Sequence, residues 1–227
     1  MKATAEQAER AHRFAHDLRN RLAAIQQVLV QLKDAPTDPA NAELFDFAEQ
    51  QYFKAMRATE ELLDDLEVER GVGALQHEVI DLGALVRSAI GSMQHRFDRK
   101  EQEVRIELDA DLMASVDPHW IMQLVSALLS NASKFTAAKG SVHVVLQRAN
   151  NSALLSITDT GVGLDAEDLA HVFTRYAWLK SRSTAGEAQG RSTLARAKQW
   201  AQAHGGDLAA TSEGPGHGCA FTLRLPL

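Results

Sequence analysis

A heptad-like hydrophobic repeat in the first third of the chain constrains the fold most strongly. Its members follow one another at alternating intervals of three and four residues, the spacing of a helical seam: Ala8, Ala11, Ala15, Leu18, Leu22, Ile25, Leu29 and Leu32. Residues 34–43 then bring two prolines, which cannot sit inside a helix. A second seam follows at Phe45, Ala48, Tyr52, Ala55, Thr59, Leu62 and Leu66. We therefore predict an antiparallel helical hairpin over residues 1–70.

One such hairpin cannot bury both seams. Pairing with a second copy of the chain would bury them in a four-helix bundle, so the repeat predicts a homodimer. The alternative is that the hairpin packs against the C-terminal part of its own chain.

The periodicity changes after a glycine-containing break, and we place a domain boundary near residues 71–78. A mixture of strand and helix patterns follows: a strand leading into a helix in 78–93, strand alternation in 103–117, a helix in 119–135, two strands in 141–160, a helix in 193–206, and strands in 207–214 and 219–227. This order predicts a sheet covered by helices on one face, giving a second domain over residues 78–227 and an α+β chain overall.

Composition excludes several classes of protein. The net charge of −6 and the lack of a basic patch argue against direct nucleic-acid binding. A single cysteine, Cys219, excludes a disulfide framework and a cysteine-rich zinc site. No apolar run approaches the roughly 18 residues of a membrane span, and the N-terminus lacks a signal peptide's apolar stretch. We expect a soluble cytoplasmic protein.

The segment "FAHDLRNRL", residues 14–22, places His16 beside Asp17. His16 falls between the seam residues Ala15 and Leu18, so it should point away from the seam, toward solvent or a partner. Taken alone, this pattern indicates an ordinary surface histidine.

Two segments of the second half carry side chains suited to a nucleotide. In "LLSNASKFT", Asn131 and Lys134 lie three apart on one helical face, where an amide oxygen can ligate Mg²⁺ and a lysine can meet a phosphate. In "DTGVGL", Asp159 ends an apolar strand and could accept a hydrogen bond from an exocyclic amine, while Gly161 and Gly163 permit a sharp turn. Each pattern also fits a bland alternative, a solvated helix face or a plain turn.

A third segment, "AGEAQGRSTLARAK", leads from a glycine-containing loop into a helix. Backbone N–H groups at such a helix start could contact phosphates. An ordinary surface loop fits the same letters.

Together and in this order, these segments resemble the catalytic core of bacterial sensor histidine kinases. "AHDLRNRLAAI" is similar to the family's phosphoacceptor box, "LLSNASKFT" to its asparagine box, "DTGVGL" to its first glycine box and "HVFTRY" to its phenylalanine box. "AHGGDL" and "SEGPGHGCAFTLRLPL" resemble its C-terminus. The resemblance implies a dimerisation and histidine-phosphotransfer hairpin followed by an α/β sandwich of the GHKL (Bergerat) ATPase type.

The resemblance also implies roles on the hairpin. His16 would be the phosphorylated residue, with Asp17 holding the ring's other N–H so that the attacking nitrogen is unprotonated. Asn20, one turn later, occupies the position of an amide that orients water when the partner regulator is dephosphorylated.

In the second domain, the resemblance implies bound ATP and Mg²⁺. Asn131 would bind Mg²⁺, Lys134 a phosphate and Asp159 the adenine amine, with Gly161 and Gly163 close to the nucleotide.

The chain departs from the family pattern at four positions. Arg21 replaces a proline five residues after the histidine, and Ala127 replaces an asparagine one helical turn before Asn131. In the second glycine box, Arg191 and Thr193 stand where glycines are expected. Their side chains would either block the approach of backbone to the triphosphate or rebuild the contact with a guanidinium and a hydroxyl.

Two functions follow from this pattern. The first is a protein histidine kinase of two-component signalling, which autophosphorylates His16 with ATP and passes the phosphoryl group to an aspartate on a response-regulator receiver domain. The alternative is a histidine phosphotransferase in a phosphorelay, whose degenerate kinase domain does not bind ATP. With no sensor domain in the sequence, we expect a separate sensor or upstream phosphodonor protein. The hairpin argues against a third possibility, an anti-sigma-factor-type serine kinase.

Overall fold

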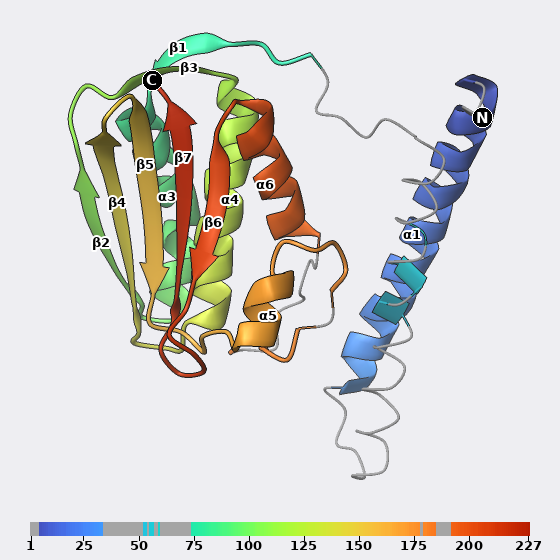
Figure 1. Ribbon diagram of the computed structural model, residues 1–227. Coiled ribbons are helices and arrows are strands. Elements are labelled where there is room, and N and C mark those ends of the chain that lie inside the picture. The colour runs from blue at the N-terminus through green and yellow to red at the C-terminus, as the bar shows by residue number, and fades with distance from the viewer. Residues whose placement is uncertain are drawn as a thin grey trace. The chain divides into compact units, whose positions relative to one another are not determined.

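The computed structural model describes residues 5–33, 52–53, 55–56, 59, 74–177, 179–184 and 192–227. The chain divides into an N-terminal unit, Met1–Gly71 with Arg175–Trp178, and a C-terminal unit, Val72–Thr174 with Leu179–Leu227. Helix α1 belongs to the N-terminal unit, and every labelled strand belongs to the C-terminal unit (Figure 1). Among the described residues, no helix combines the length and apolarity needed to cross a membrane.

Helix α1 runs over Ala5–Lys33 and confirms the first helix of the predicted hairpin. Along its predicted seam, Ala15 is buried and Leu22 packs against a cluster of Tyr52, Phe53 and Met56, whereas Ile25 is 51% exposed. The connecting residues 34–43 and the predicted seam positions 45, 48, 62 and 66 lie outside the described residues. Pairing of two hairpins into a four-helix bundle stays a prediction.

The buried positions of the second predicted seam differ from the expected ones. Ala55 is exposed, and the larger side chains of Phe53 and Met56 are buried instead. Burying an aromatic ring or a methionine removes more apolar area from water than burying a methyl group. Thr59 is buried as predicted, and its hydroxyl donates to the Ala55 carbonyl oxygen at 2.9 Å.

The C-terminal unit contains both strands and helices. In chain order these are β1 (Glu78–Asp81), α3 (Leu82–Arg99), β2 (Glu103–Leu108), β3 (Met113–Val116), α4 (Pro118–Phe135), β4 (Ser141–Ala149), β5 (Ser152–Asp159), α5 (Ala166–His171), α6 (Thr193–Ala203), β6 (Asp207–Thr211) and β7 (Cys219–Pro226). The sequence patterns predicted each of them except the short helix α5.

Five strands form one sheet in the order β2-β4-β5-β7-β6. Strand β2 runs parallel to β4, and the other neighbouring pairs are antiparallel. Helices α3, α4 and α6 lie on one side of this sheet, which confirms the predicted sheet covered on one face (Figure 1). The strand pattern over 103–117 is divided between two sheets, because β3 leaves the main sheet and pairs with β1.

Helix α4 is the central helix of the covering layer. The Asp117 carboxylate caps its start by accepting from the backbone N–H groups of His119 and Trp120, and Pro118 occupies the first turn. The four apolar positions predicted from helical spacing are each at most 1% exposed: Ile121, Leu124, Leu128 and Leu129. Their burial fixes the rotation of the helix and hence the direction of its polar side chains.

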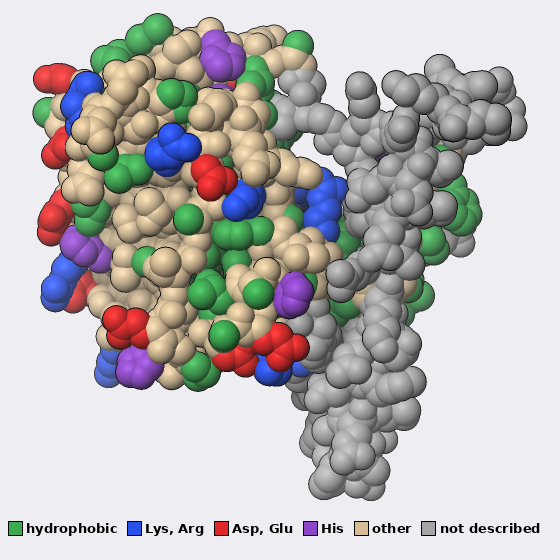
Figure 2. Space-filling view, in the orientation of Figure 1, with side chains coloured by type: hydrophobic (Ala, Val, Ile, Leu, Met, Phe, Trp, Pro, Cys, Tyr) green, Lys and Arg blue, Asp and Glu red, His purple; other side chains and the backbone are tan. Residues whose placement is uncertain are grey.

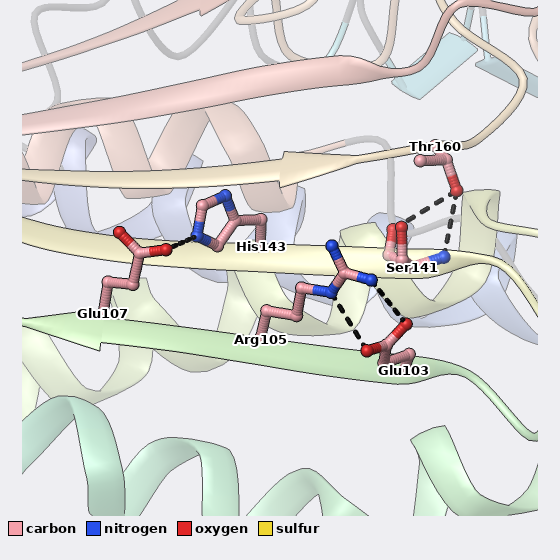
Figure 3. A network of polar contacts seen from close by, with 6 residues as sticks. All are labelled: Glu103, Arg105, Glu107, Ser141, His143 and Thr160. Atoms are coloured by element: carbon pink, nitrogen blue, oxygen red, sulfur yellow. Dashed lines mark hydrogen bonds and ion pairs between the residues drawn. The ribbon is translucent and has the colours of Figure 1, made fainter.

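None of the described helices of the C-terminal unit lies on the opposite face of the sheet (Figure 1). Along its outer strand β2, Arg105 forms two hydrogen bonds with the Glu103 carboxylate, and Glu107 contacts His143 of β4 at 3.1 Å (Figure 3). In the space-filling view, charged side chains gather along the left rim of this face (Figure 2). The strand therefore keeps its charges paired within the chain.

Candidate functional site

A pocket opens in the C-terminal unit where β5 ends, beside the last turns of α4. The empty space in it, including open solvent at its mouth, is ≈ 340 Å³. Its wall is mainly apolar with a few polar groups: Asn131, Phe135, Asp159, Val162, Gly163, Leu164, Val172, Leu179, Ser181, Leu194, Cys219 and Phe221. Two of the sequence-predicted side chains, Asn131 and Asp159, thus line one cavity.

Asp159 is the buried charge of this pocket. It is the last residue of β5 and only 3% exposed, and its Oδ1 accepts from the Gly161 backbone N–H at 2.8 Å. Burial raises the pKa of this carboxyl to about 6, although hydrogen bonds from the Gly161 and Cys219 backbones work against the rise. Such a carboxylate can accept a hydrogen bond from a base amine, provided that the ligand excludes water from it.

The two glycines after Asp159 are required by close backbone approaches. A Cβ on Gly161 would meet the Phe135 carbonyl oxygen, and a Cβ on Gly163 would collide with the Gly214 carbonyl oxygen. Gly163 also has φ +69°, which L side chains rarely adopt. The turn after β5 therefore lies tightly between α4 and the loop that precedes β7.

Helix α4 places Asn131 in the pocket wall, but Lys134 is not among the wall residues. Lys134 is half-buried in the last turn, and its carbonyl oxygen accepts from the backbone N–H of Thr184 at 3.0 Å. The three-residue spacing put both side chains on one helical face, yet only the first of them reaches the cavity.

The second glycine box is described only in part. Arg191 lies outside the described residues, while Thr193 begins α6 and Leu194 reaches the pocket wall. Ser192, before the helix, makes no capping hydrogen bond with its side chain. Backbone N–H groups in the first turn of a helix are the kind of donors that can bind a phosphate.

Sequence reasoning missed Cys219. Strand pairing sets it directly opposite Asp159, and burial together with the nearby Asp159 charge raises the pKa of its thiol to about 12. The thiol is therefore protonated at neutral pH and acts as a small neutral wall of the pocket. Only the register of β5 against β7 could have revealed it, and a single sequence does not contain that register.

Two further residues missed from the sequence hold the segment that borders the pocket. The buried carboxylate of Asp168 accepts from the backbone N–H groups of Lys180 and Ser181, both at 2.9 Å. The Lys100 ammonium donates to the Thr184 hydroxyl and to carbonyl oxygens at the end of α4. Residues 179–184 are thus attached at both ends, which positions Leu179 and Ser181 in the pocket wall.

In the N-terminal unit, His16 is an exposed side chain of α1. The Asn20 Nδ2 lies 3.3 Å from the ring Nδ1, within hydrogen-bond distance, whereas the nearest Asp17 oxygen lies 3.8 Å from that nitrogen. Asn20 thus contacts the ring nitrogen that Asp17 was expected to hold, while the Asp17 carboxylate lies beyond hydrogen-bond length. Residues one position apart on a helix do not face each other, whereas residues four apart do.

Comparison with known proteins shows what the pocket-bearing region is similar to. Residues 116–227 match the model of the histidine kinase-, DNA gyrase B- and HSP90-like ATPase family. This range lies inside the C-terminal unit. Asn131, Asp159, Gly161 and Gly163 all fall within the matched residues.

Similarity to curated proteins extends beyond these matched residues. The chain is 30% identical over 172 residues to the circadian input-output histidine kinase CikA of Synechococcus elongatus, an alignment that covers 73% of this chain and 22% of CikA. It is 31% identical over 224 residues to the adaptive-response sensory kinase SasA of a Synechococcus species, covering 94% of this chain and 58% of SasA. The chain thus spans only part of the length of these relatives.

Solved structures show the same fold. A mycobacterial sensor histidine kinase, MprB, superposes with a TM-score of 0.58 at 25% identity, over 66% of this chain and 97% of that structure. The catalytic domain of the histidine kinase ThkA gives a TM-score of 0.60 at 18% identity, over 67% of this chain and 96% of that structure. The C-terminal unit therefore has the α/β sandwich fold expected from the sequence.

Proposed function

We propose that this chain is a protein histidine kinase of two-component signalling, which binds ATP in the pocket beside Asp159 and autophosphorylates His16. The single observation that carries the proposal is the alignment with SasA, a sensory kinase, over 94% of the chain. That alignment covers the helix of His16 as well as the residues that match the ATPase family. Binding and phosphoacceptor functions thus have a counterpart in one relative.

The pocket supports ATP as the nucleotide. The Asp159 carboxylate would accept from the adenine amine between apolar walls, where Val172, Leu179 and Phe221 exclude water. The first turn of α6, with Thr193, would meet the phosphates. Lys134 and Arg191 remain candidates for further phosphate contacts.

Asn131 fits a magnesium ion held mainly by the nucleotide. Its amide oxygen is a ligand that Mg²⁺ accepts, and it lies in the pocket wall. The described residues contain no cluster of three or more acidic, histidine or cysteine side chains able to hold a metal. Phosphate oxygens and water would complete the shell, and the ion would neutralise phosphate charge.

The transfer to His16 balances as an in-line displacement. The Nε2 lone pair would form a bond to the γ-phosphorus, and the bond from that phosphorus to its bridging oxygen would break with its electron pair on ADP. The ring would then lose its Nδ1 proton to water or to the Asp17 carboxylate. The histidine must therefore start with Nε2 unprotonated.

The products and partners follow from the same proposal. Phosphorylated His16 would pass its group to an aspartate of a response-regulator receiver domain, and Asn20 would orient water when that regulator is dephosphorylated. A homodimer of hairpins and an upstream sensor or phosphodonor protein complete the proposed assembly. The relay alternative is not favoured, because the relatives are named as kinases and the pocket retains Asn131 and Asp159.

The first test is calorimetric titration of the full chain with ATP and Mg²⁺. We expect saturable binding that is lost in Asp159→Asn. Absence of binding to the wild-type chain at millimolar ATP would overturn the kinase proposal and return the relay to first place.

The second test is incorporation of phosphate from γ-labelled ATP. We expect a label that is stable to base, labile to acid, and absent from His16→Gln. His12→Gln is the matched control, because His12 is an exposed histidine one turn earlier on α1 and should leave labelling unchanged. Labelling that survives His16→Gln would show that another residue accepts the phosphate.

A further inference from the structure

The geometry around His16 bears on which ring nitrogen can react. Asn20 lies one helical turn after His16 on the same face, and its Nδ2 approaches the ring Nδ1 at 3.3 Å. Asp17 lies on a different face, and its Oδ1 stays 3.8 Å from Nδ1, beyond hydrogen-bond length. Of these two neighbours, the amide therefore engages Nδ1.

An amide nitrogen has only donors to offer, so the ring nitrogen that it contacts must accept. A neutral imidazole carries one proton, and a ring nitrogen that accepts a hydrogen bond does not hold it. When the Asn20 amide donates to Nδ1, the ring proton resides on Nε2. In this arrangement Nε2 has no free lone pair for attack on a phosphorus atom.

We propose that Asn20 is a positioning residue that holds His16 as the Nε2–H tautomer and thereby restrains its phosphorylation; the second half rests on the proposed kinase function. Rotation of the Asn20 amide would let its oxygen accept from Nδ1–H, and rotation of His16 or Asp17 would let the Asp17 carboxylate accept from it instead. Either change favours the tautomer with the proton on Nδ1, in which the Nε2 lone pair is free. His16 and Asp17 are 59% and 75% exposed, so either change needs only rotation of solvent-facing side chains.

The test is the imidazole nitrogen spectrum of the full chain labelled with ¹⁵N-histidine, recorded without nucleotide at about pH 8, where an ordinary histidine is neutral. His16→Gln assigns the His16 signals among the nine histidines. We expect the wild-type signals to show a protonated Nε2. In Asn20→Ala the ratio of Nδ1–H to Nε2–H should rise about twofold, since an exposed pair four residues apart is a weak interaction. Asn20→Asp should raise it further, because a carboxylate only accepts.

Gln27→Ala is the matched control, an exposed amide of the same helix replaced by the same residue, and it should leave the His16 signals in place. An unchanged tautomer ratio in Asn20→Ala would overturn the proposal, and so would a wild-type spectrum with Nδ1 protonated. Initial labelling by ATP, measured separately, should rise about twofold in Asn20→Ala. A tautomer shift in a chain that takes no label would support the control by Asn20 and overturn the kinase proposal instead.

Discussion

The pocket around Asp159 and the surroundings of His16 are opposites in burial. Asp159 is 3% exposed, held by backbone N–H groups and enclosed by fixed apolar walls. The His16 side chain is 59% exposed, and its neighbours Asp17 and Asn20 are solvent-facing side chains of the same helix. One site is built into the core, whereas the other stands on a surface.

The difference matches two kinds of chemistry. Recognition of a base by one carboxylate gains strength from burial, because the local dielectric is low and the contact is specific. Under the proposed function, His16 would meet a nucleotide and then a second protein, and both encounters need access from outside. Substitutions should accordingly affect folding strongly at the pocket and weakly on α1.

The largest effect is expected for Gly163→Ala. The added Cβ would collide with the Gly214 carbonyl oxygen in a backbone conformation that alanine disfavours, so the free energy of unfolding should fall by about 3 kcal/mol. Urea denaturation of the full chain measures it. Gly91→Ala, inside α3 with open space around its Cβ position, should instead stabilise by about 0.5–1 kcal/mol. Equal effects at the two positions would contradict the tight turn after β5.

The second-largest effect on the free energy of unfolding is expected for Asp159→Asn, which removes a buried charge that destabilises the folded state. The pKa of Asp159 is raised from 3.8 to about 6, so the neutral acid is favoured in the fold, and its contribution to stability is lost as pH rises through about 6. At pH 7.5 the variant without nucleotide should therefore unfold with a free energy about 2 kcal/mol higher than wild type. The same variant should no longer bind ATP.

The control for Asp159→Asn is pH itself. Denaturation at about pH 4 should shrink the difference between the two proteins to roughly 0.5 kcal/mol, because Asp159 is then neutral in the folded chain and only about half ionised in the unfolded chain. A difference that did not change between pH 4 and pH 7.5 would show that the burial of the Asp159 charge has no role in stability.

A smaller effect is expected for Lys100→Met. The substitution removes the ammonium that joins the Thr184 hydroxyl to the carbonyl oxygens at the end of α4, so stability should fall by about 1 kcal/mol and proteolysis near residues 180–184 should become faster. Lys139→Met removes only an exposed pair with Glu101 and should change stability by less than about 0.5 kcal/mol. Limited proteolysis and urea denaturation test both variants.

The smallest effect is expected for His16→Gln, within about 0.5 kcal/mol of wild type, because the side chain is exposed and makes one weak contact. Thermal or urea unfolding measures this against Gly163→Ala. A decrease in the free energy of unfolding above about 1 kcal/mol would mean that His16 has a structural role, and would contradict the difference between the two sites.

Most of the helices and strands were predicted from hydrophobic periodicity along the chain. Long helices and alternating strands were predicted correctly because their spacing is local, as the four buried leucine and isoleucine positions of α4 show. Helix α5, with six residues, is too short to establish a period. The sequence analysis expected Ala55 to be buried, but Phe53 is buried and Ala55 is exposed. The heptad spacing was applied to positions alone and took no account of side-chain volume.

The candidate site was predictable only where its residues formed recognisable segments. Asn131 and Asp159 were found from segments that resemble family boxes, and the structure brings both to one cavity. Cys219 enters the pocket through strand register, and Asp168 acts through main-chain contacts twelve and thirteen residues away. The four-residue spacing places Asn20 and His16 on one helical face, but which ring nitrogen the amide contacts depends on side-chain rotation, which spacing does not specify.

The paired charges on β2 also limit self-association. An outer strand with free backbone groups is a template on which another chain can add a strand. Here an incoming strand would have to displace or dehydrate the pairs of Glu103 with Arg105 and of Glu107 with His143. These polar side chains should therefore disfavour the addition of a strand from another chain at this edge.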